Sequence, residues 1–281
     1  MAKQNKKKGK QSWRREDPTR SKPLSLDALK EYKALEGFEA PEGNFDPNGA
    51  WDHLYRLWLV ANPWHQYRGF FQIARSAPAD GAVELRVNRS ILLSQHPAFH
   101  NTEIQMTCAA DTLCTPRSWE LSAETLDIHG KPFDASRVEE SASVNGGTIT
   151  AKRNGRGLTR AIPTPFTSDF SLLDAVQRLP KADTKPLQFA LLQDMDKIKE
   201  GQSLTYREKV DFEIGGKTLP LHCYQQIGRG LLPYRYYVDE QGRLLFAFSA
   251  VRAYIYDPKV HEQQKKSVDW LITREKRKAQ K

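Results

Sequence analysis

One stretch, residues 218–257, constrains the fold of this 281-residue chain more than any other. It reads TLPLHCYQQIGRGLLPYRYYVDEQGRLLFAFSAVRAYIYD and is rich in Tyr, Phe, Val and Leu, residue types that favour strands. The turn-forming groups Gly228-Arg229-Gly230 and Asp239-Glu240-Gln241-Gly242 interrupt it. The pattern therefore predicts three strands within the stretch, at 219–226, 234–238 and 243–256.

The chain before this stretch contains further short strand-like runs separated by turn signals. Asn145-Gly146 and Asn154-Gly155 are strong hairpin signals, because both residue types accept the positive φ angles of tight turns. Connections this short join neighbouring strands in an antiparallel arrangement. The predicted strands are 67–75, 83–93, 102–108, 118–126, 137–144, 148–153, 158–162 and 204–214.

Other segments place their apolar residues at helical spacing. The pattern predicts helices at 24–35, at 48–60 and after the capping pair Ser168-Asp169. Residues 187–199 are compatible with a strand that enters a helix or with a single helix. The resulting element order predicts an α+β fold with a large curved antiparallel β-sheet, half-barrel-like, and helices packed on one face.

The net charge of +9 is concentrated at the two ends of the chain. The first 22 residues hold nine Lys or Arg against two acidic residues, and the last 23 hold eight against three. The sequence between them is slightly acidic, so only the ends suit nucleic acid or another acidic partner. Solvated, disordered arms are the alternative interpretation. The expected organisation is a disordered basic arm at 1–23, a short helix and linker at 24–44, an antiparallel α+β domain at 45–258 and a basic tail at 259–281.

The three cysteines, Cys108, Cys114 and Cys223, form no CxxC pair, which argues against a structural zinc site. Their odd number, together with an N-terminus that lacks an apolar signal region, predicts reduced thiols and a cytoplasmic protein. No apolar run is long enough for a transmembrane segment.

One segment, SQHPAFHNTE, carries two histidines four residues apart. His96 and His100 would share a helix face and suit a metal, but Pro97 favours a loop, so no metal ligands are predicted. A hydrolase that uses His96, His100 and Asp111 is kept as an alternative function. The sequence contains no nucleophile elbow, Walker loop or Rossmann loop, so no catalytic residue and no cofactor are predicted.

Three segments resemble a known group of proteins: LLDAVQRLP, LQFALLQDMDKIKEGQSLTYRE and LPLHCYQQIGRGLLPYRYYVDEQGRLL. Over residues 172–257 the chain resembles uncharacterised bacterial exported β-rich domains related to the lipoprotein-carrier-like fold. The resemblance implies a curved antiparallel sheet wrapped around helices, and it offers an exported or periplasmic location as the alternative to the cytoplasm. It carries no catalytic residue.

The leading functional hypothesis is a non-enzymatic binding or structural domain that holds an apolar small molecule or lipid in the concave face of its sheet. The expected ligand contacts are Leu245 and Phe248, on opposite faces of the predicted strand 243–256, and Trp51 and Trp58 on the predicted helix 48–60. Helices that fill the concave face would make a solid structural body, and helices that only rim it would leave a groove. The sequence leaves these alternatives, and the oligomeric state, open.

Overall fold

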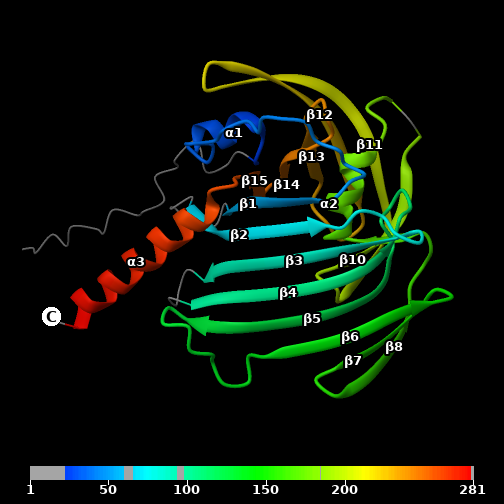
Figure 1. The fold of residues 1–281 in the computed structure, drawn as a ribbon, viewed down its shortest axis with the longest axis horizontal. Helices are drawn as coiled ribbons and strands as arrows, with labels where there is room; N and C mark the ends of the chain where they lie inside the picture. The colour runs from blue at the N-terminus through cyan, green and yellow to red at the C-terminus, as the bar shows by residue number, and fades with distance from the viewer. Residues whose placement is uncertain (1–22, 60–65, 94–97, 184, 280–281) are drawn as a thin grey trace, which may run out of the picture.

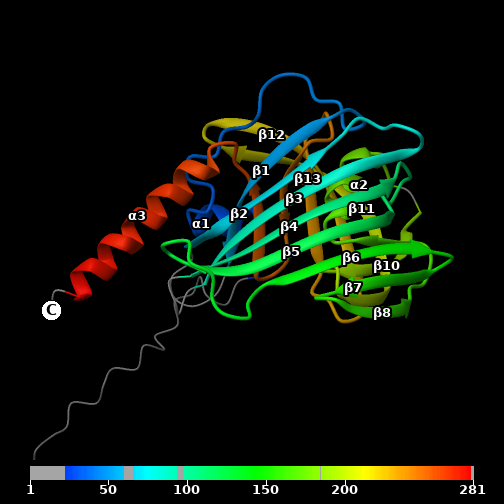
Figure 2. The same cartoon turned by 60° about the horizontal axis from the view of Figure 1, so that its bottom comes forward.

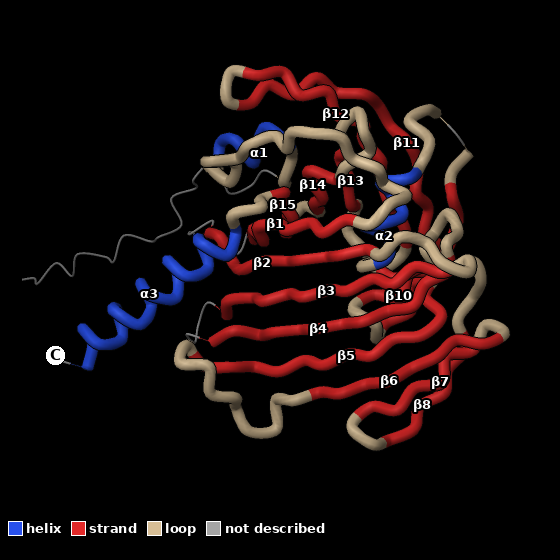
Figure 3. The backbone as a smooth tube through the Cα atoms, in the orientation of Figure 1, coloured by secondary structure: helices blue, strands red, loops and turns tan. Residues whose placement is uncertain are grey.

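The computed structural model describes residues 23–59, 66–93, 98–183 and 185–279 (Figure 1). Most of them form one 15-stranded sheet that is strongly curved but not closed (Figure 3). The strands are β1 (Trp51–Leu59), β2 (Gln66–Arg75), β3 (Ala82–Leu93), β4 (Ala98–Ala109), β5 (Pro116–Asp127), β6 (Val138–Asn145), β7 (Thr148–Arg153), β8 (Arg156–Ala161), β9 (Phe166–Ser168), β10 (Leu187–Gln193), β11 (Lys197–Ile214), β12 (Lys217–Gly228), β13 (Tyr234–Val238), β14 (Leu244–Phe248) and β15 (Arg252–Tyr256).

The sheet consists of two meanders joined at its centre. Its strand order is β8-β7-β6-β5-β4-β3-β2-β1-β15-β14-β13-β12-β11-β10-β9. Every pair is antiparallel except β9 and β10, which run parallel. The first and last strands, β1 and β15, pair with each other, with Tyr55 opposite Tyr256. The edges of the sheet are therefore β8 and β9, which are consecutive in the chain, and the curve brings the end of the first meander towards the start of the second.

Each face of the sheet carries its own apolar cluster. The concave cluster packs around a short helix, α2 (Ser171–Ala175), and the 3₁₀ turn that continues it, η1 (Val176–Arg178), which lie inside the curve (Figure 2). The convex cluster packs the first helix, α1 (Leu26–Glu31), against β12 to β15 and β1. A third helix, α3 (Val260–Ala279), crosses the convex face and extends beyond it (Figure 1). The α+β class and the large curved antiparallel sheet are confirmed, and the helices are distributed over both faces.

The predicted helix at 48–60 is wrong, because residues 51–59 form β1. Trp51, Tyr55 and Leu57 are buried in the concave cluster, whereas Trp58 is buried in the convex one. A central strand that is covered on both faces has no polar side, so its apolar residues imitate the spacing of a helix. Residues 187–199 are likewise not helical but form β10, a turn and the start of β11.

The predicted strand 243–256 is interrupted in the structure. β14 ends at Phe248 and β15 begins at Arg252, and the Ser249 amide donates to the Arg252 carbonyl in the hairpin between them. The turn residues Ser249-Ala250-Val251 include no Gly, Pro, Asn or Asp, so the strong turn signals that mark the other hairpins are absent from this segment.

Residues 260–279 form α3. The interpretation of the C-terminal tail as a disordered arm is therefore wrong for this segment. Leu271 of this helix is buried against Phe99 and Ile128. The N-terminal arm lies outside the described residues, apart from the segment that leads into α1. There the predicted helix is confirmed, with Ser25 as its N-cap and its hydroxyl accepting from the Ala28 amide.

A buried ion cluster fixes the inner helix to the sheet. Asp174 of α2 is fully buried, and its carboxylate lies 2.8 Å from Nε of Arg75 on β2 and 2.7 Å from the Arg178 guanidinium. Arg75 also donates to the carbonyls of Asn48 and Gly49. An ion pair without access to water depends on both partners, because a charge left alone there loses its hydration without compensation. This cluster therefore holds the inner helix within the curve.

We expect Arg75→Met to lower the free energy of unfolding by about 3 kcal/mol, because it leaves Asp174 with a single cationic partner in a dry site. Urea denaturation of the two proteins measures the difference. Arg137→Met is the matched control. Its partner Glu139 is 60% exposed and Arg137 itself 68% exposed, so its removal should change stability by less than about 0.5 kcal/mol. Equal effects of the two substitutions would contradict the anchoring role.

The three cysteines are free and buried, as the sequence predicts. Burial raises the pKa of the Cys223 thiol to about 11, and a hydrogen bond with Cys108 together with burial raises the pKa of Cys114. Since the thiolate is the reactive form, native protein at pH 8 should react with a thiol reagent such as Ellman's reagent only over hours. Denatured, non-reduced protein should release three equivalents at once. Rapid reaction of the native protein would show that these sites open readily.

Candidate functional site

The four residues expected to contact a ligand do not form one site. Leu245, Phe248 and Trp58 all lie in the convex cluster, packed beneath α1, whereas Trp51 lies in the concave cluster. Leu245 and Phe248 share a face because of a β-bulge: Tyr237 pairs with Phe246 but Val238 pairs with Leu244, so Leu245 has no partner. The predicted alternation is therefore wrong at this position.

The residues of the alternative hydrolase site do not converge either. His100 lies near the start of β4, and Asp111 follows the end of the same strand. Eleven residues of extended chain separate them by about 35 Å. His96 lies outside the described residues. Within the described ranges no group of three or more His, Cys, Asp or Glu side chains is placed to hold a metal ion.

A partly enclosed recess at one end of the concave face, here called the end recess, is the strongest candidate site. Its volume is about 80 Å³. It is bounded by the start of the inner helix, by β10, and by β12, β13 and β15 with the loop between β12 and β13. Its lining residues are Asp169, Phe170, Leu173, Leu191, Gln193, Gln226, Leu231, Leu232, Tyr234, Tyr236, Arg252 and Tyr254.

Two of its polar residues are already satisfied within the protein. The Tyr236 hydroxyl donates to the Gln226 side chain at 2.7 Å, and the Gln226 amide donates to Gln202 at 3.2 Å. Burial raises the pKa of Tyr236 well above its ordinary value, so this phenol stays neutral. The Tyr236 and Gln226 side chains are therefore held by each other and by Gln202, and they line the recess without offering a free donor hydroxyl.

Two further groups of the end recess, Arg252 and Tyr234, are donors available to a ligand. Arg252 forms no salt bridge among the described residues. The Tyr254 hydroxyl, which also hydrogen-bonds the Arg252 side chain, raises the pKa of its guanidinium, and Tyr234 and the charge of Asp194 act in the same direction. The Tyr234 hydroxyl is buried and has no hydrogen-bond partner within the described part of the chain. A buried unsatisfied hydroxyl is costly to maintain, and such groups concentrate at functional sites.

Asp169 is the acidic group of the end recess. It follows β9 directly, and its carboxylate accepts a hydrogen bond from the Asp194 amide at 3.1 Å. Burial raises the pKa of Asp169 to about 7, and the negative charge of Asp194 acts in the same direction. Asp169 therefore changes its protonation state near neutral pH.

A second ion pair lies next to the end recess. Arg89 of β3 binds Asp194 in the β10–β11 turn at 2.8 Å, and its guanidinium stacks over the Phe170 ring. Burial, followed by the positive charge of Arg89, lowers the pKa of His100. Of the residues of the alternative hydrolase site, His100 thus lies near this end of the interior. Its acidic neighbour there is Asp194, whereas the hydrolase hypothesis paired it with Asp111.

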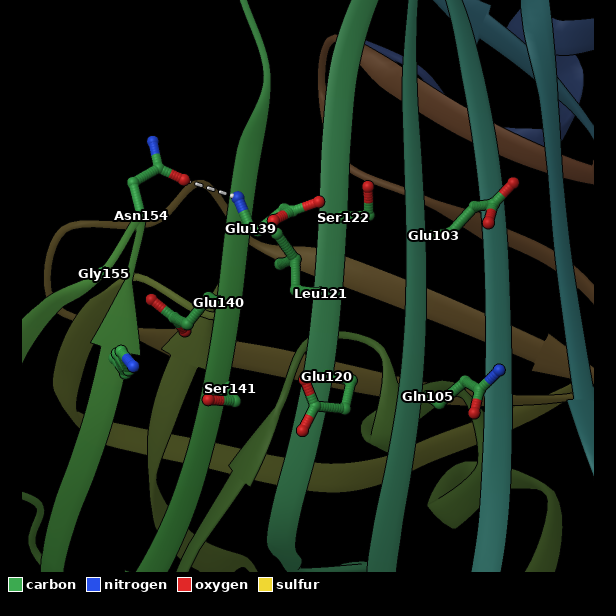
Figure 4. A pocket seen from close by; sticks show the side chains of 11 residues that line it. Glu103, Gln105, Glu120, Leu121, Ser122, Glu139, Glu140, Ser141, Asn154 and Gly155 are labelled. Carbon is green, nitrogen blue, oxygen red and sulfur yellow. Dashed lines mark hydrogen bonds between the residues drawn. The ribbon is translucent and has the colours of Figure 1, made fainter.

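Two of the larger recesses are open and lack these features. One, of about 610 Å³, lies across β4 to β7, and most of its side chains, among them Glu103, Glu120 and Ser141, belong to the convex face (Figure 4). Its inward-facing Glu140 is paired with Arg153 and with the Trp119 indole. The other, of about 710 Å³, lies at the opposite end of the interior, near Asp111. Wide polar surface recesses are common, whereas ligand sites are usually enclosed and partly apolar.

Sequence reasoning missed the end recess because its residues come from distant segments. Arg252 stands in a run of strand-forming residues, and Ser168-Asp169 was interpreted only as a helix cap. A charged residue inside a long apolar strand is the one available signal, since such a charge needs a partner or a functional reason.

We expect Asp169→Asn to change how stability depends on pH. The raised pKa of Asp169 means that folding favours its protonated form, so the carboxyl imposes no cost near pH 4 and destabilises the fold progressively as the pH rises to 7 and beyond. The asparagine variant should therefore equal the wild type near pH 4 and be more stable at pH 8, with a higher melting temperature by a few degrees. Denaturation curves at both pH values test this. A variant that is less stable at pH 8 would contradict the assignment.

Comparisons with known proteins show a similar fold and give no function. No protein-family model matches the chain, and no curated protein sequence matches it significantly. The structure is similar to the crystal structure of a beta-barrel-like protein of the domain of unknown function DUF1849 from Brucella abortus, with a TM-score of 0.51 and 10% identity over 75% of this chain and 96% of that one. A DUF1089 family protein from Pseudomonas aeruginosa gives a TM-score of 0.37 and 12% identity over 74% of this chain and 94% of the other. The chain therefore has a β-barrel-like fold, similar to that of a protein of a domain of unknown function.

Proposed function

We propose that this chain is a non-enzymatic binding domain and that its end recess takes a small amphiphilic carboxylate. The observation that carries the proposal is the pair of donors on one side of the recess. Arg252 forms no salt bridge within the described residues, and the buried Tyr234 hydroxyl has no hydrogen-bond partner there. An arginine and a phenol together suit a carboxylate, because charge-assisted hydrogen bonds are stronger than neutral ones.

The rest of the end recess suits the apolar part of such a ligand. Phe170, Leu173 and Leu191 are buried at its floor, and Leu231 and Leu232 lie in the loop beside it. Leu232 is 53% exposed. The alkyl chain of a ligand whose carboxylate is bound by Arg252 therefore passes over Leu232 to reach the protein surface. The resemblance to lipoprotein-carrier-like domains is consistent with a ligand that has an apolar part.

The volume limits the size of the enclosed part. A cavity of about 150 Å³ holds one benzene molecule, and the end recess measures about 80 Å³. The inner helix and its cluster separate the end recess from the open recess near Asp111, so a complete lipid does not fit in the end recess. A carboxylate with a short alkyl chain fits, with its distal carbons at the mouth.

Hexanoate is the test ligand, with hexylammonium as the charge-reversed probe, and binding is followed by NMR chemical-shift changes in the full chain. We expect saturable binding of hexanoate and none of hexylammonium. Arg252→Gln should weaken hexanoate binding about tenfold or more, because it removes a charge-assisted hydrogen bond. Tyr234→Phe should weaken it by a smaller factor.

Arg235→Gln is the matched control, since Arg235 is an exposed arginine on β13, next in sequence to Tyr234, and does not line the recess. It should leave hexanoate binding unchanged. Equal binding of hexanoate and hexylammonium, or unchanged hexanoate binding by a folded Arg252→Gln protein, would refute the proposal.

A further inference from the structure

The helix α3 uses only one of its sides to pack against the sheet. The His261 ring contacts Phe70 of β2, Gln264 reaches Ser90 of β3, and Leu271 is buried against Phe99 of β4. These contacts are spaced three to seven residues apart along the helix, as expected for one face. The helix thus crosses three consecutive strands on the convex side and leaves its opposite side to solvent.

The solvent side of α3 carries Trp270 among the cations Lys266, Arg274 and Arg277. These four residues are here called the basic stripe. Trp270 is 60% exposed, and the Arg274 guanidinium lies over its ring at 5.3 Å. Lys266, Arg274 and Arg277 stand four residues before, four after and seven after Trp270, so all three share its side of the helix. A large exposed indole inside a cluster of positive charges is unusual for a solvated helix face.

Exposed apolar residues are concentrated at one end of the strands. In an antiparallel meander the loops alternate between two ends. The β5–β6, β12–β13 and β14–β15 connections lie at the end where β3 also finishes, at Leu93. Among the described residues, the exposed large apolar side chains are Leu93, Phe133, Leu158, Ile227, Leu232, Val251 and Trp270. All except Leu158 lie at the end of β3, in or next to these connections, or in α3, which packs on Phe99 and Ile128 at this same end.

We propose that this strand end, with the basic stripe, docks on the surface of a lipid bilayer that contains anionic lipids. Tryptophan and basic side chains together are typical of residues that lie at the interface between lipid and water. Cations near an anionic leaflet are attracted to it, and apolar loop residues gain by entering the acyl region. The apolar residues lie on separate loops and do not form the single large patch typical of a protein interface. Aliphatic loop residues form no favourable contact with the charged phosphodiester backbone, so their exposure argues against nucleic acid as the partner.

The helices of the described residues include none that is long and apolar enough to cross a membrane. The proposed contact lies at the bilayer surface, and it does not require a ligand in the end recess.

Flotation of the full chain with vesicles tests the docking surface. One set of vesicles is pure phosphatidylcholine, and the other contains 30% phosphatidylglycerol. We expect binding to the anionic vesicles alone. Lys266→Gln/Arg277→Gln should lower the partition coefficient about tenfold or more, and Trp270→Ala should lower it several-fold.

Matched controls separate this surface from general charge and hydrophobicity. Lys185→Gln/Lys217→Gln removes two exposed cations away from α3, and Leu158→Ala truncates an exposed apolar residue on the edge strand β8. Both should float like the wild type.

Three outcomes would overturn the proposal. The protein fails to bind anionic vesicles, or the stripe variants bind as well as the wild type. Alternatively, a single-stranded RNA 20-mer binds through the same stripe residues while vesicles do not. Hexanoate binding by the stripe variants should remain that of the wild type, so failure of this proposal is distinguishable from failure of the binding function.

Discussion

The buried carboxylate of Asp174 determines what the curved sheet can enclose. Its ion pairs with Arg75 and Arg178 hold the inner helix inside the curve, and the Gln177 side chain that follows accepts from the Leu244 amide at 3.1 Å. Gly242 approaches this turn so closely that a Cβ atom there would lie 2.4 Å from the Gln177 carbonyl. The helix therefore fills the middle of the concave face, and the enclosed space that remains is the small volume beyond its N-terminal end, since the recess near Asp111 is open.

The same arrangement explains why the sheet curves without closing. The edges β8 and β9 do not pair, and side chains bridge the gap instead of a backbone ladder. Arg153 of β7 binds Asp196 at 2.9 Å, and Arg160 of β8 donates to the Met195 and Asp196 carbonyls. Cationic side chains at an exposed edge also oppose pairing with other chains. The inner helix covers the concave face, and these side-chain contacts hold β7 and β8 near the β10–β11 turn.

The sequence predicted those parts of the structure in which local pattern and tertiary environment agree. Strands that bury one face alternate cleanly, and Asn145-Gly146 and Asn154-Gly155 marked real hairpins. The prediction failed at β1, where both faces are buried, and at Leu245, where a bulge shifts the alternation. The candidate site could not be predicted, because Asp169, Tyr234 and Arg252 come from separate elements and meet only through the curvature of the sheet.

The end recess and the basic stripe lie on opposite faces of the sheet but at the same strand end. Leu232 lies between the two sites: it lines the end recess and is also one of the exposed apolar residues at that strand end. A bilayer docked on α3 and these loops would bring its headgroup region to the mouth of the recess. An amphiphilic carboxylate could then move between bilayer and Arg252 with its apolar carbons shielded from water throughout. The hydrophobic cost of transfer, about 0.8 kcal/mol for each exposed methylene, would thereby be avoided. This coupling gives a physical reason for apolar loop residues that the fold itself does not need.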